Sequence, residues 1–235
     1  MSLPFFYKED LIASSTDIVL DEATSKHIVQ VLRMQNSEQL QLTNGKGNLF
    51  MAEIVDNNRK RCAVKILKTF DIPHSPFSIT VAISPVKNTT RFEWFLEKAT
   101  EIGVTEIIPL VCSRTEKTAF KFERMNSILV SAMLQSQQTW LPVLQEPTKF
   151  NQVVQSSTQQ QKFIAHCMDD AKRKLKDLNN ESLSSKIILI GPEGDFTADE
   201  IELALQNYFS AVSLGGTRLR TETAGIVAAT LLILP

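Results

Sequence analysis

The chain has 235 residues, of which 43% are hydrophobic and 22% are charged, a composition that is ordinary for a globular protein and excludes a disordered chain. The formal net charge of -1 excludes a uniformly basic nucleic-acid binder, so any contact with RNA must come from local patches. Two basic runs, at 59–68 and 172–176, are candidates, although such runs are also typical of a solvated face.

Cysteine use and the apolar runs limit the class of protein further. The isolated residues Cys62, Cys112 and Cys167 lack metal-ligand spacing, which predicts small reduced core residues and no metal site. The first ten residues carry no signal-peptide pattern, and the apolar run 224–234 is too short to span a membrane. We therefore expect a cytoplasmic protein without a membrane partner.

The first part of the chain is predicted to be a small β domain with one helix. Apolar and polar residues alternate over 39–43, 48–55 and 61–70, with turn residues between these segments. The helix is expected over 24–33. Its apolar face would hold Ile28, Val31 and Leu32, while His27 and Arg33 either reach out to a ligand or form the polar rim of a core helix.

The pattern changes at the proline-containing segment 73–76, which we take as the boundary between a domain of residues 1–72 and one of residues 73–235. Beyond it, strands and helices alternate, which predicts an α/β domain with a mostly parallel sheet covered on both faces. The expected strands are 78–84, 106–111, 162–166, 187–190 and 211–214, and the expected helices are 91–102, 123–137, 198–208 and 224–234.

Two glycine-containing turns follow the last two strands. In the first, Gly191 and Gly194 flank Pro192 and would let a ligand approach the backbone closely. Thr197 and Glu200 have the spacing of a capping box, which predicts a helix that begins near Ala198.

The second turn holds Gly215 and Gly216, followed by Arg218 and Arg220, before Thr221 or Thr223 caps the last helix. Each turn alone is also compatible with a plain tight turn and solvated arginines. Neither a dinucleotide fingerprint nor a phosphate-binding loop is present in the sequence.

Several separated motifs resemble those of the RsmE family, and the resemblance covers nearly the whole chain. The carboxyl-terminal ones are Ile-Gly-Pro-Glu-Gly at 190–194, Leu-Gly at 214–215 and Leu-Arg-Thr-Glu-Thr-Ala at 219–224. The others are His-Ile at 27–28 with Val-Leu-Arg at 31–33, and Lys-Ala-Thr-Glu-Ile-Gly-Val at 98–104.

The resemblance implies a SPOUT-type methyltransferase domain with a carboxyl-terminal trefoil knot, preceded by a PUA-like β-barrel domain that grips RNA. The implied activity is S-adenosylmethionine-dependent methylation of a uridine at N3 in 16S ribosomal RNA of the small subunit. A homodimer is implied as well. Two alternatives stay open: another SPOUT RNA methyltransferase, acting on the ribose of transfer or ribosomal RNA, and a non-catalytic RNA-binding factor for ribosome assembly.

The resemblance also implies roles for individual residues. Arg220 would stabilise the anion that forms on uracil, and Glu222 or Glu193 would accept the proton or orient that arginine. RNA contacts are implied for His27, Arg33, Arg91 and Arg114. The expected cofactor-binding residues are Leu189, Ile190, Gly191, Pro192, Glu193, Gly194, Leu214, Gly215, Leu219, Arg220, Thr221, Thr223 and Ala224.

The chain departs from the family pattern at two positions. Gln138 stands where many members carry an arginine, which puts in doubt a substrate-anchoring role for the segment 134–138. Asp195 replaces a glycine after Gly194, and its carboxylate is expected to satisfy amides near the start of the following helix.

Overall fold

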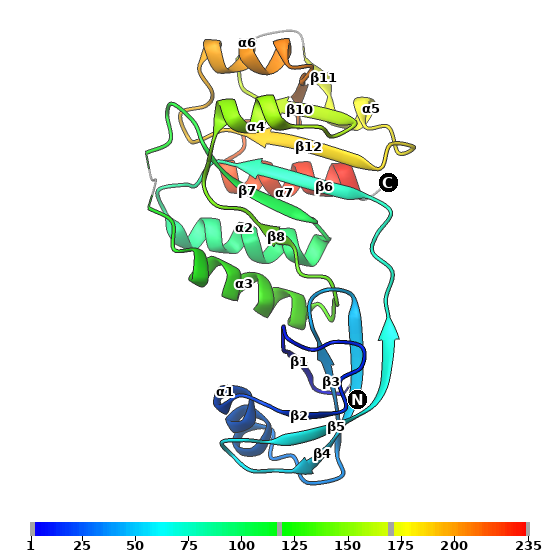
Figure 1. Cartoon of the computed structure of the whole chain (residues 1–235). Helices are drawn as coiled ribbons and strands as arrows, with labels where there is room; N and C mark the ends of the chain where they lie inside the picture. Colours follow the sequence, from blue (N-terminus) through cyan, green and yellow to red (C-terminus); the bar gives the residue numbers. More distant parts are fainter. Residues whose placement is uncertain (1–2, 117–118, 169–171, 234–235) are drawn as a thin grey trace. The chain divides into compact units, whose positions relative to one another are not determined.

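The computed structural model describes residues 3–116, 119–168 and 172–233, and the chain divides into two compact units (Figure 1). The first unit holds Met1–His74 and Met133–Leu141, and the second holds Ser75–Ala132 and Pro142–Pro235. The segment Met133–Leu141 thus belongs to the first unit although it lies beyond the expected boundary.

The first unit is built on a five-stranded sheet with the order β1-β3-β4-β5-β2. Alternating residues of the central strands, such as Leu40, Leu42, Phe50 and Ile54, are buried in one core. The two outer strands were not predicted, because three residues are too few to show an alternation. The strands are β1 (Phe5–Tyr7), β2 (Asp17–Val19), β3 (Gln39–Thr43), β4 (Asn48–Asp56) and β5 (Ala63–Asp71).

The predicted helix of this unit is two short helical segments, α1 (Glu22–Lys26) and the π-helix η1 (His27–Val31). Asp21 caps the first, because its carboxylate accepts the Thr24 N–H at 2.9 Å. Ile28 is fully buried, but Val31 is 68% exposed and Leu32 is 41% exposed. The prediction that both share the buried face was wrong, because the wider π turn changes the helical period that the prediction assumed.

The segment Met133–Leu141 is fixed within the first unit by Trp140. Its indole N–H donates to the Ile72 carbonyl at 3.0 Å, and its ring lies edge-on to His74. Gly47 lies against the same indole with a φ of +88°, and a Cβ there would stand 2.3 Å from the ring. Only glycine satisfies both constraints.

The second unit contains an eight-stranded parallel sheet, in which seven strands have the order β11-β13-β10-β12-β6-β7-β8 and the eighth, β9, pairs with β7. The predicted parallel sheet is therefore confirmed. Three strands of two residues each were not predicted. The strands are β6 (Ser78–Ile83), β7 (Glu106–Val111), β8 (Val143–Leu144), β9 (Thr148–Lys149), β10 (Gln161–Ala165), β11 (Arg173–Lys174), β12 (Ser185–Ile190) and β13 (Ser210–Ser213).

Helices cover both faces of this sheet (Figure 1). On one face, Ile187 and Leu189 of β12 pack with α4 and α6 in one core. On the other, Ile83 of β6 contacts α2 and α7, where Gly225 lies so close that a Cβ would stand 2.7 Å from Ile83 Cδ1 and from the Phe95 ring. The helices are α2 (Thr89–Ile102), α3 (Phe122–Gln135), α4 (Phe150–Ser156), α5 (Leu175–Leu178), α6 (Ala198–Gln206) and α7 (Thr221–Ile233).

Some predicted ends need correction. Helix α6 ends at Gln206, and Tyr208 beyond it has a φ of +66°. Helix α7 already begins at Thr221, so the prediction that Thr221 or Thr223 caps it from outside was wrong. Leu234, the expected last residue of that helix, lies outside the described residues. Over the part of the chain that is described, no helix combines the length and the apolar character needed to cross a membrane.

Candidate functional site

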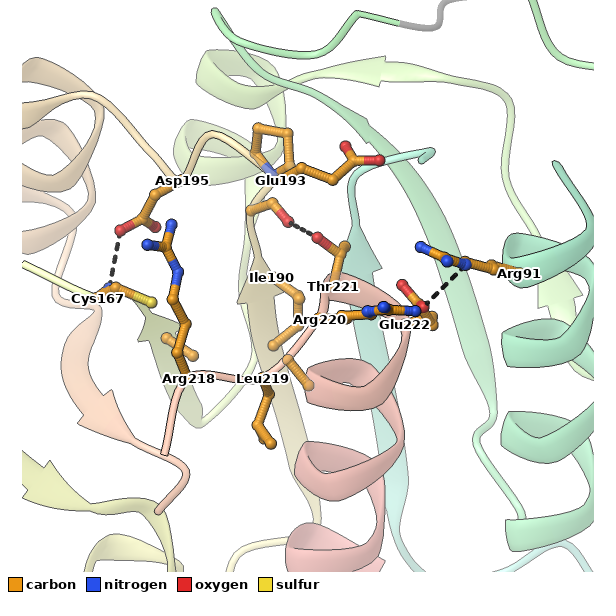
Figure 2. Close-up of a pocket in the computed structure, with 14 residues that line it drawn as sticks. Arg91, Cys167, Ile190, Glu193, Asp195, Arg218, Leu219, Arg220, Thr221 and Glu222 are labelled. Atoms are coloured by element: carbon orange, nitrogen blue, oxygen red, sulfur yellow. Dashed lines mark hydrogen bonds and ion pairs between the residues drawn. The ribbon is translucent and has the colours of Figure 1, made fainter. Parts of the chain in front are cut away.

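Two adjoining cavities lie where the parallel strands β10, β12 and β13 end, and Figure 2 shows the residues that line the first of them. Their volumes are about 400 and 460 Å³, within the range of small-molecule sites. Ligands of open parallel sheets commonly bind at the carboxyl ends of the strands. Both cavities are lined by Ala165, Cys167, Arg218, Leu219 and Ala224, so these residues form a shared wall.

Most of the predicted cofactor residues line these cavities. Leu189 is buried in the core on the α4 and α6 side, and Gly194 and Thr223 are not among the lining residues. The first cavity is lined by Ile190, Gly191, Pro192, Glu193, Leu219, Arg220, Thr221 and Ala224, and the second by Leu214, Gly215, Leu219 and Ala224.

The glycines of the first turn are closely packed against other residues of the protein. A Cβ on Gly191 would stand 3.1 Å from the Phe196 ring, and one on Gly194 would stand 3.3 Å from Arg114 Cδ. In the second turn, a Cβ on Gly215 or Gly216 would meet no atom within 4 Å. Open space for a ligand therefore adjoins the second turn.

Arg114 and Lys87 hold the first turn from neighbouring loops. The Arg114 guanidinium donates to the Gly194 carbonyl at 2.7 Å and to the Phe196 carbonyl at 3.4 Å. The Lys87 N–H donates to the Glu193 carboxylate at 3.0 Å. Arg114 thus has a contact within its own unit, and its contact with RNA stays a prediction.

Asp195 connects the loops that follow two adjacent strands. One carboxylate oxygen accepts the Phe196 N–H at 2.9 Å, and the other accepts the Cys167 N–H at 2.8 Å (Figure 2). The expectation that Asp195 satisfies an amide before α6 is confirmed for Phe196. Cys167 is exposed and lines both cavities, so its predicted place in the core was wrong.

The start of α6 is fixed by the predicted capping box. The Thr197 hydroxyl accepts the Glu200 N–H at 3.2 Å, while the Glu200 carboxylate accepts the Thr197 N–H at 2.9 Å. Glu200 is buried and its other oxygen accepts the Ser113 N–H at 2.7 Å. Burial, and secondarily the Glu200 carboxylate, raises the pKa of the Cys112 thiol far above its ordinary value.

The first turn of α7 brings polar groups to the first cavity. The buried Thr221 hydroxyl donates to the Gly191 carbonyl at 3.1 Å. Glu222 follows, with a side chain only 9% exposed, and its Oε1 lies 3.7 Å from Arg91 Nε on α2 (Figure 2). Arg91, expected to face RNA, therefore lies beside the predicted catalytic carboxylate.

Arg218 and Arg220 are exposed and extend from the loop before α7. Figure 2 shows Arg218 directed toward the side of Asp195 and Arg220 toward the side of Glu222. Three arginines and three carboxylates therefore line the first cavity, namely Arg91, Arg218, Arg220, Glu193, Asp195 and Glu222. Such a lining suits a ligand that carries both positive and negative groups.

Two predicted site residues belong to the first unit. His27 is exposed and lies edge-on to Phe6, with ring centroids 5.9 Å apart. Arg33 is exposed beyond η1 with a φ of +57°. The expected helix thus ends before Arg33, and the contact of both side chains with RNA stays a prediction.

The prediction from sequence missed the loop that follows β10. Ala165 and Cys167 line both cavities, and His166 and Lys172 line the second. The available signal was positional, because this loop leaves a parallel strand at the same edge as the two glycine turns. Among the described residues, no three His, Cys, Asp or Glu side chains gather as a metal site would require.

Comparisons with known proteins define the class. The family model described as RNA methyltransferase domain matches residues 73–233, and the one described as RNA methyltransferase PUA domain matches residues 20–67. The first match covers more than half of the chain, so the chain carries the RNA methyltransferase domain of that family. A PUA-like domain precedes the α/β domain, as predicted.

A relative named ribosomal RNA small subunit methyltransferase E, from Synechocystis sp., is 30% identical over 217 residues, which cover 90% of this chain and 71% of the relative. The chain therefore belongs to the ribosomal RNA small subunit methyltransferase E (RsmE) family. The resemblance seen in the separated motifs is thereby confirmed.

Two solved structures are similar over nearly the whole length. A probable rRNA-methyltransferase from Porphyromonas gingivalis is 36% identical with a TM-score of 0.91, and 98% of each chain is covered. The ribosomal RNA small subunit methyltransferase E from Neisseria gonorrhoeae, solved bound to S-adenosyl methionine, is 28% identical with a TM-score of 0.87. That similarity covers 97% of this chain and 96% of the other.

Proposed function

We propose that this protein transfers the methyl group of S-adenosylmethionine to N3 of a uridine in 16S ribosomal RNA of the small subunit. Its family and the activity for which its relatives are named support the reaction class. The observation that carries the proposal is the pair of cavities at the strand ends, with Arg220 and Glu222 on the lining of one of them.

The cavities fit this cofactor in size and chemistry. Together they offer the open backbone of Gly215 and Gly216, apolar surface from Ile190, Leu214 and Leu219, and side chains of both charges. S-adenosylmethionine carries an apolar ring face, a carboxylate and two positive groups. When bound, it supplies a carbon that its sulfonium activates for in-line displacement.

The residues of the chain must then deal with the uracil proton. N3 carries a proton that has to leave as the nitrogen–carbon bond forms and the carbon–sulfur bond breaks. The Glu222 carboxylate accepts this proton and passes it to solvent, while the Arg220 guanidinium donates to a uracil oxygen on which negative charge grows. Arg91, whose Nε lies 3.7 Å from Glu222 Oε1, orients this carboxylate.

The first unit supplies RNA-binding surface in this proposal. His27 and Arg33 are exposed there, as are Arg59, Lys60 and Arg61 of the first basic run. Arginine and lysine side chains hold the phosphate backbone, and histidine can stack on an unpaired base. Two arginines of the second unit, Arg114 and the partly exposed Arg91, are proposed as further RNA contacts.

We further propose the finer architecture that the family implies. Residues 1–72 form the RNA-binding domain and residues 73–235 form a SPOUT domain whose carboxyl-terminal chain passes through a loop as a trefoil knot. The protein acts in the cytoplasm as a homodimer. Light scattering tests the dimer, and a monomeric mass at working concentration would contradict it.

Methyl transfer is tested with labelled S-adenosylmethionine and small ribosomal subunits from a strain that lacks the endogenous activity. Digestion and nucleoside mass spectrometry should then reveal N3-methyluridine. Methyl groups on ribose or on another base would overturn the specificity. Cofactor binding without any transfer would favour a ribosome-assembly factor that only binds RNA.

A further inference from the structure

Asp195 occupies a backbone position that favours glycine. Its φ is +63°, in the left-handed region where a side chain is disfavoured, although aspartate tolerates it better than most residues. The family pattern described above has a glycine here. A side chain kept at such a position, in the wall of the first cavity, needs a role that glycine cannot fill.

Capping of α6 is not that role. The helix begins at Ala198, and its capping box is made by Thr197 and Glu200, which accept one another's N–H groups without Asp195. Only one Asp195 oxygen bonds locally, to the Phe196 N–H. The other points away from the helix and accepts the N–H of Cys167, 28 residues earlier in the chain.

The bond to Cys167 joins two loops that leave adjacent strands. Strands β10 and β12 are parallel neighbours, with Ala165 opposite Ile190 at their carboxyl ends. Beyond that pair the ladder stops, so the backbone no longer fixes the distance between the loops. The hydrogen bond from the Cys167 N–H to the Asp195 carboxylate takes the place of a further backbone hydrogen bond between the two strands. The negative charge of the carboxylate strengthens it.

Cys167 is part of the wall shared by the two cavities. The position of its backbone therefore determines the width of both at the place where they adjoin. A cofactor that spans both turns has to pass this wall. Because the wall is already fixed before the cofactor binds, less conformational entropy is lost on binding.

We infer that Asp195 is a positioning residue that holds the Cys167 wall and so sets the affinity for S-adenosylmethionine. The inference rests on the proposed function. In this inference Asp195 positions the wall and takes no part in the methyl transfer itself, and its two oxygens accept the Cys167 and Phe196 N–H groups. Its loss should weaken cofactor binding and leave the chemical step intact.

The first experiment measures cofactor binding by calorimetry and turnover with saturating RNA. Asp195→Gly, which also relieves the left-handed backbone, should raise the Kd for S-adenosylmethionine about tenfold, equivalent to about 1.4 kcal/mol. Asp195→Asn keeps one acceptor oxygen and should raise it about threefold. The matched control Asp199→Asn removes an exposed carboxylate on α6 and should change nothing. The kcat at saturating cofactor should stay within about twofold of the wild type in all three variants.

The second experiment measures the wall without any cofactor. Cys167 is the exposed cysteine, whereas Cys62 and Cys112 are buried, so iodoacetamide reports on the wall through Cys167. Peptide mass spectrometry should show several-fold faster alkylation in Asp195→Gly than in the wild type. Urea unfolding of the same samples verifies that the variant is folded.

The inference requires both results. If the wild type binds S-adenosylmethionine and Asp195→Gly binds it with the same Kd, the inference is overturned but the proposed function is not. An alkylation rate of Cys167 that is unchanged in Asp195→Gly would have the same meaning. A tenfold loss of kcat at saturating cofactor would also overturn it, because it would place Asp195 at the reacting atoms. A wild type that does not bind S-adenosylmethionine would overturn the proposed function first, and the inference with it.

Discussion

Arg91 Nε lies 3.7 Å from Glu222 Oε1, and this ion pair joins the first turns of α2 and α7 beside the first cavity. The two partners differ in environment, because the Glu222 side chain is 9% exposed and that of Arg91 is 45% exposed. A carboxylate so far out of water needs a partner to offset its lost solvation. The exposed Arg91 guanidinium therefore orients the buried acid and also lines the cavity beside it.

Arg91→Gln should lower kcat by about ten- to a hundredfold, because a misplaced proton acceptor loses much of its effect. If Arg91 acts through Glu222, the same change made in a Glu222→Gln background should cost almost nothing more. Single-turnover methylation of all four proteins measures this coupling. Additive losses would contradict the relationship and leave Arg91 as an independent RNA contact.

Arg124→Gln provides the matched control for Arg91. Its guanidinium bonds Glu93 at 2.6 Å, again between two helices of the second unit, but neither residue lines the cavities described above. Its side chain is 61% exposed. We expect wild-type kcat for this variant. A loss equal to that of Arg91→Gln would show that helix packing, not Glu222, explains the effect.

The sequence could not reveal the ion pair, although it contained both residues. Arg91 and Glu222 are far apart in the chain, and only the packing of α7 beside α2 brings them together. The approach depends on Gly225, whose missing side chain leaves room for Phe95. Sequence motifs located the turns because glycine, proline and capping residues act locally. For Arg91 the motifs predicted only a contact with RNA, because a family pattern contains no distances between side chains.

Arg220→Ala should lower kcat by about a hundredfold and change the affinity for S-adenosylmethionine little, because the guanidinium is needed where charge develops on the uracil. Arg220→Lys keeps the charge but loses the planar fork of donors, so an intermediate kcat is expected. Single-turnover rates with saturating RNA and cofactor measure both variants. Equal kcat in Arg220→Ala and the wild type would remove Arg220 from the mechanism.

Thr221→Val should lower the free energy of unfolding by about 1–3 kcal/mol, because the buried Gly191 carbonyl would lose the hydroxyl that donates to it at 3.1 Å. Thr221→Ser keeps the hydroxyl and should recover most of the loss. Urea unfolding compares the three proteins. If Thr221→Ser were as unstable as Thr221→Val, the methyl group and not the hydrogen bond would be responsible.

Gly225→Ala should destabilise the protein although alanine favours a helix by about 1 kcal/mol over glycine. The added Cβ would stand 2.7 Å from both Ile83 Cδ1 and the Phe95 ring, and overpacking of this kind costs about 1–3 kcal/mol. Gly216→Ala is the control for stability, because no atom lies within 4 Å of its added Cβ. Thermal unfolding that shows Gly225→Ala to be more stable would contradict the close packing of α7.

Much of the fold was predictable because its sheet follows simple patterns. Strands β6, β7 and β12 are largely apolar runs, as both faces of a parallel strand are covered. The two- and three-residue strands were missed because they pair without showing any period. Exposed Val31 and Leu32 were misplaced because helical spacing alone cannot distinguish an α turn from a π turn.

Cys112 and Cys167 should differ in how their thiols respond to pH and in how readily a reagent reaches them. Burial, and secondarily Glu200, raises the pKa of Cys112 from its ordinary value of 9.0. Below that value both the folded and the unfolded thiol are protonated, and the group contributes nothing to the pH dependence. Above it the unfolded chain releases the proton while the folded protein keeps it, so stability falls as pH rises.

Cys112→Ala should therefore flatten the alkaline loss of stability by up to about 1.4 kcal/mol per pH unit between roughly pH 9 and 10.5. Urea unfolding across this range measures the slope. Iodoacetamide at about pH 8 should meanwhile modify Cys167 first in the native protein, because Cys112 is buried and protonated. Equal alkaline slopes in Cys112→Ala and the wild type, or early alkylation of Cys112, would mean that the thiol is not held in the core beside Glu200.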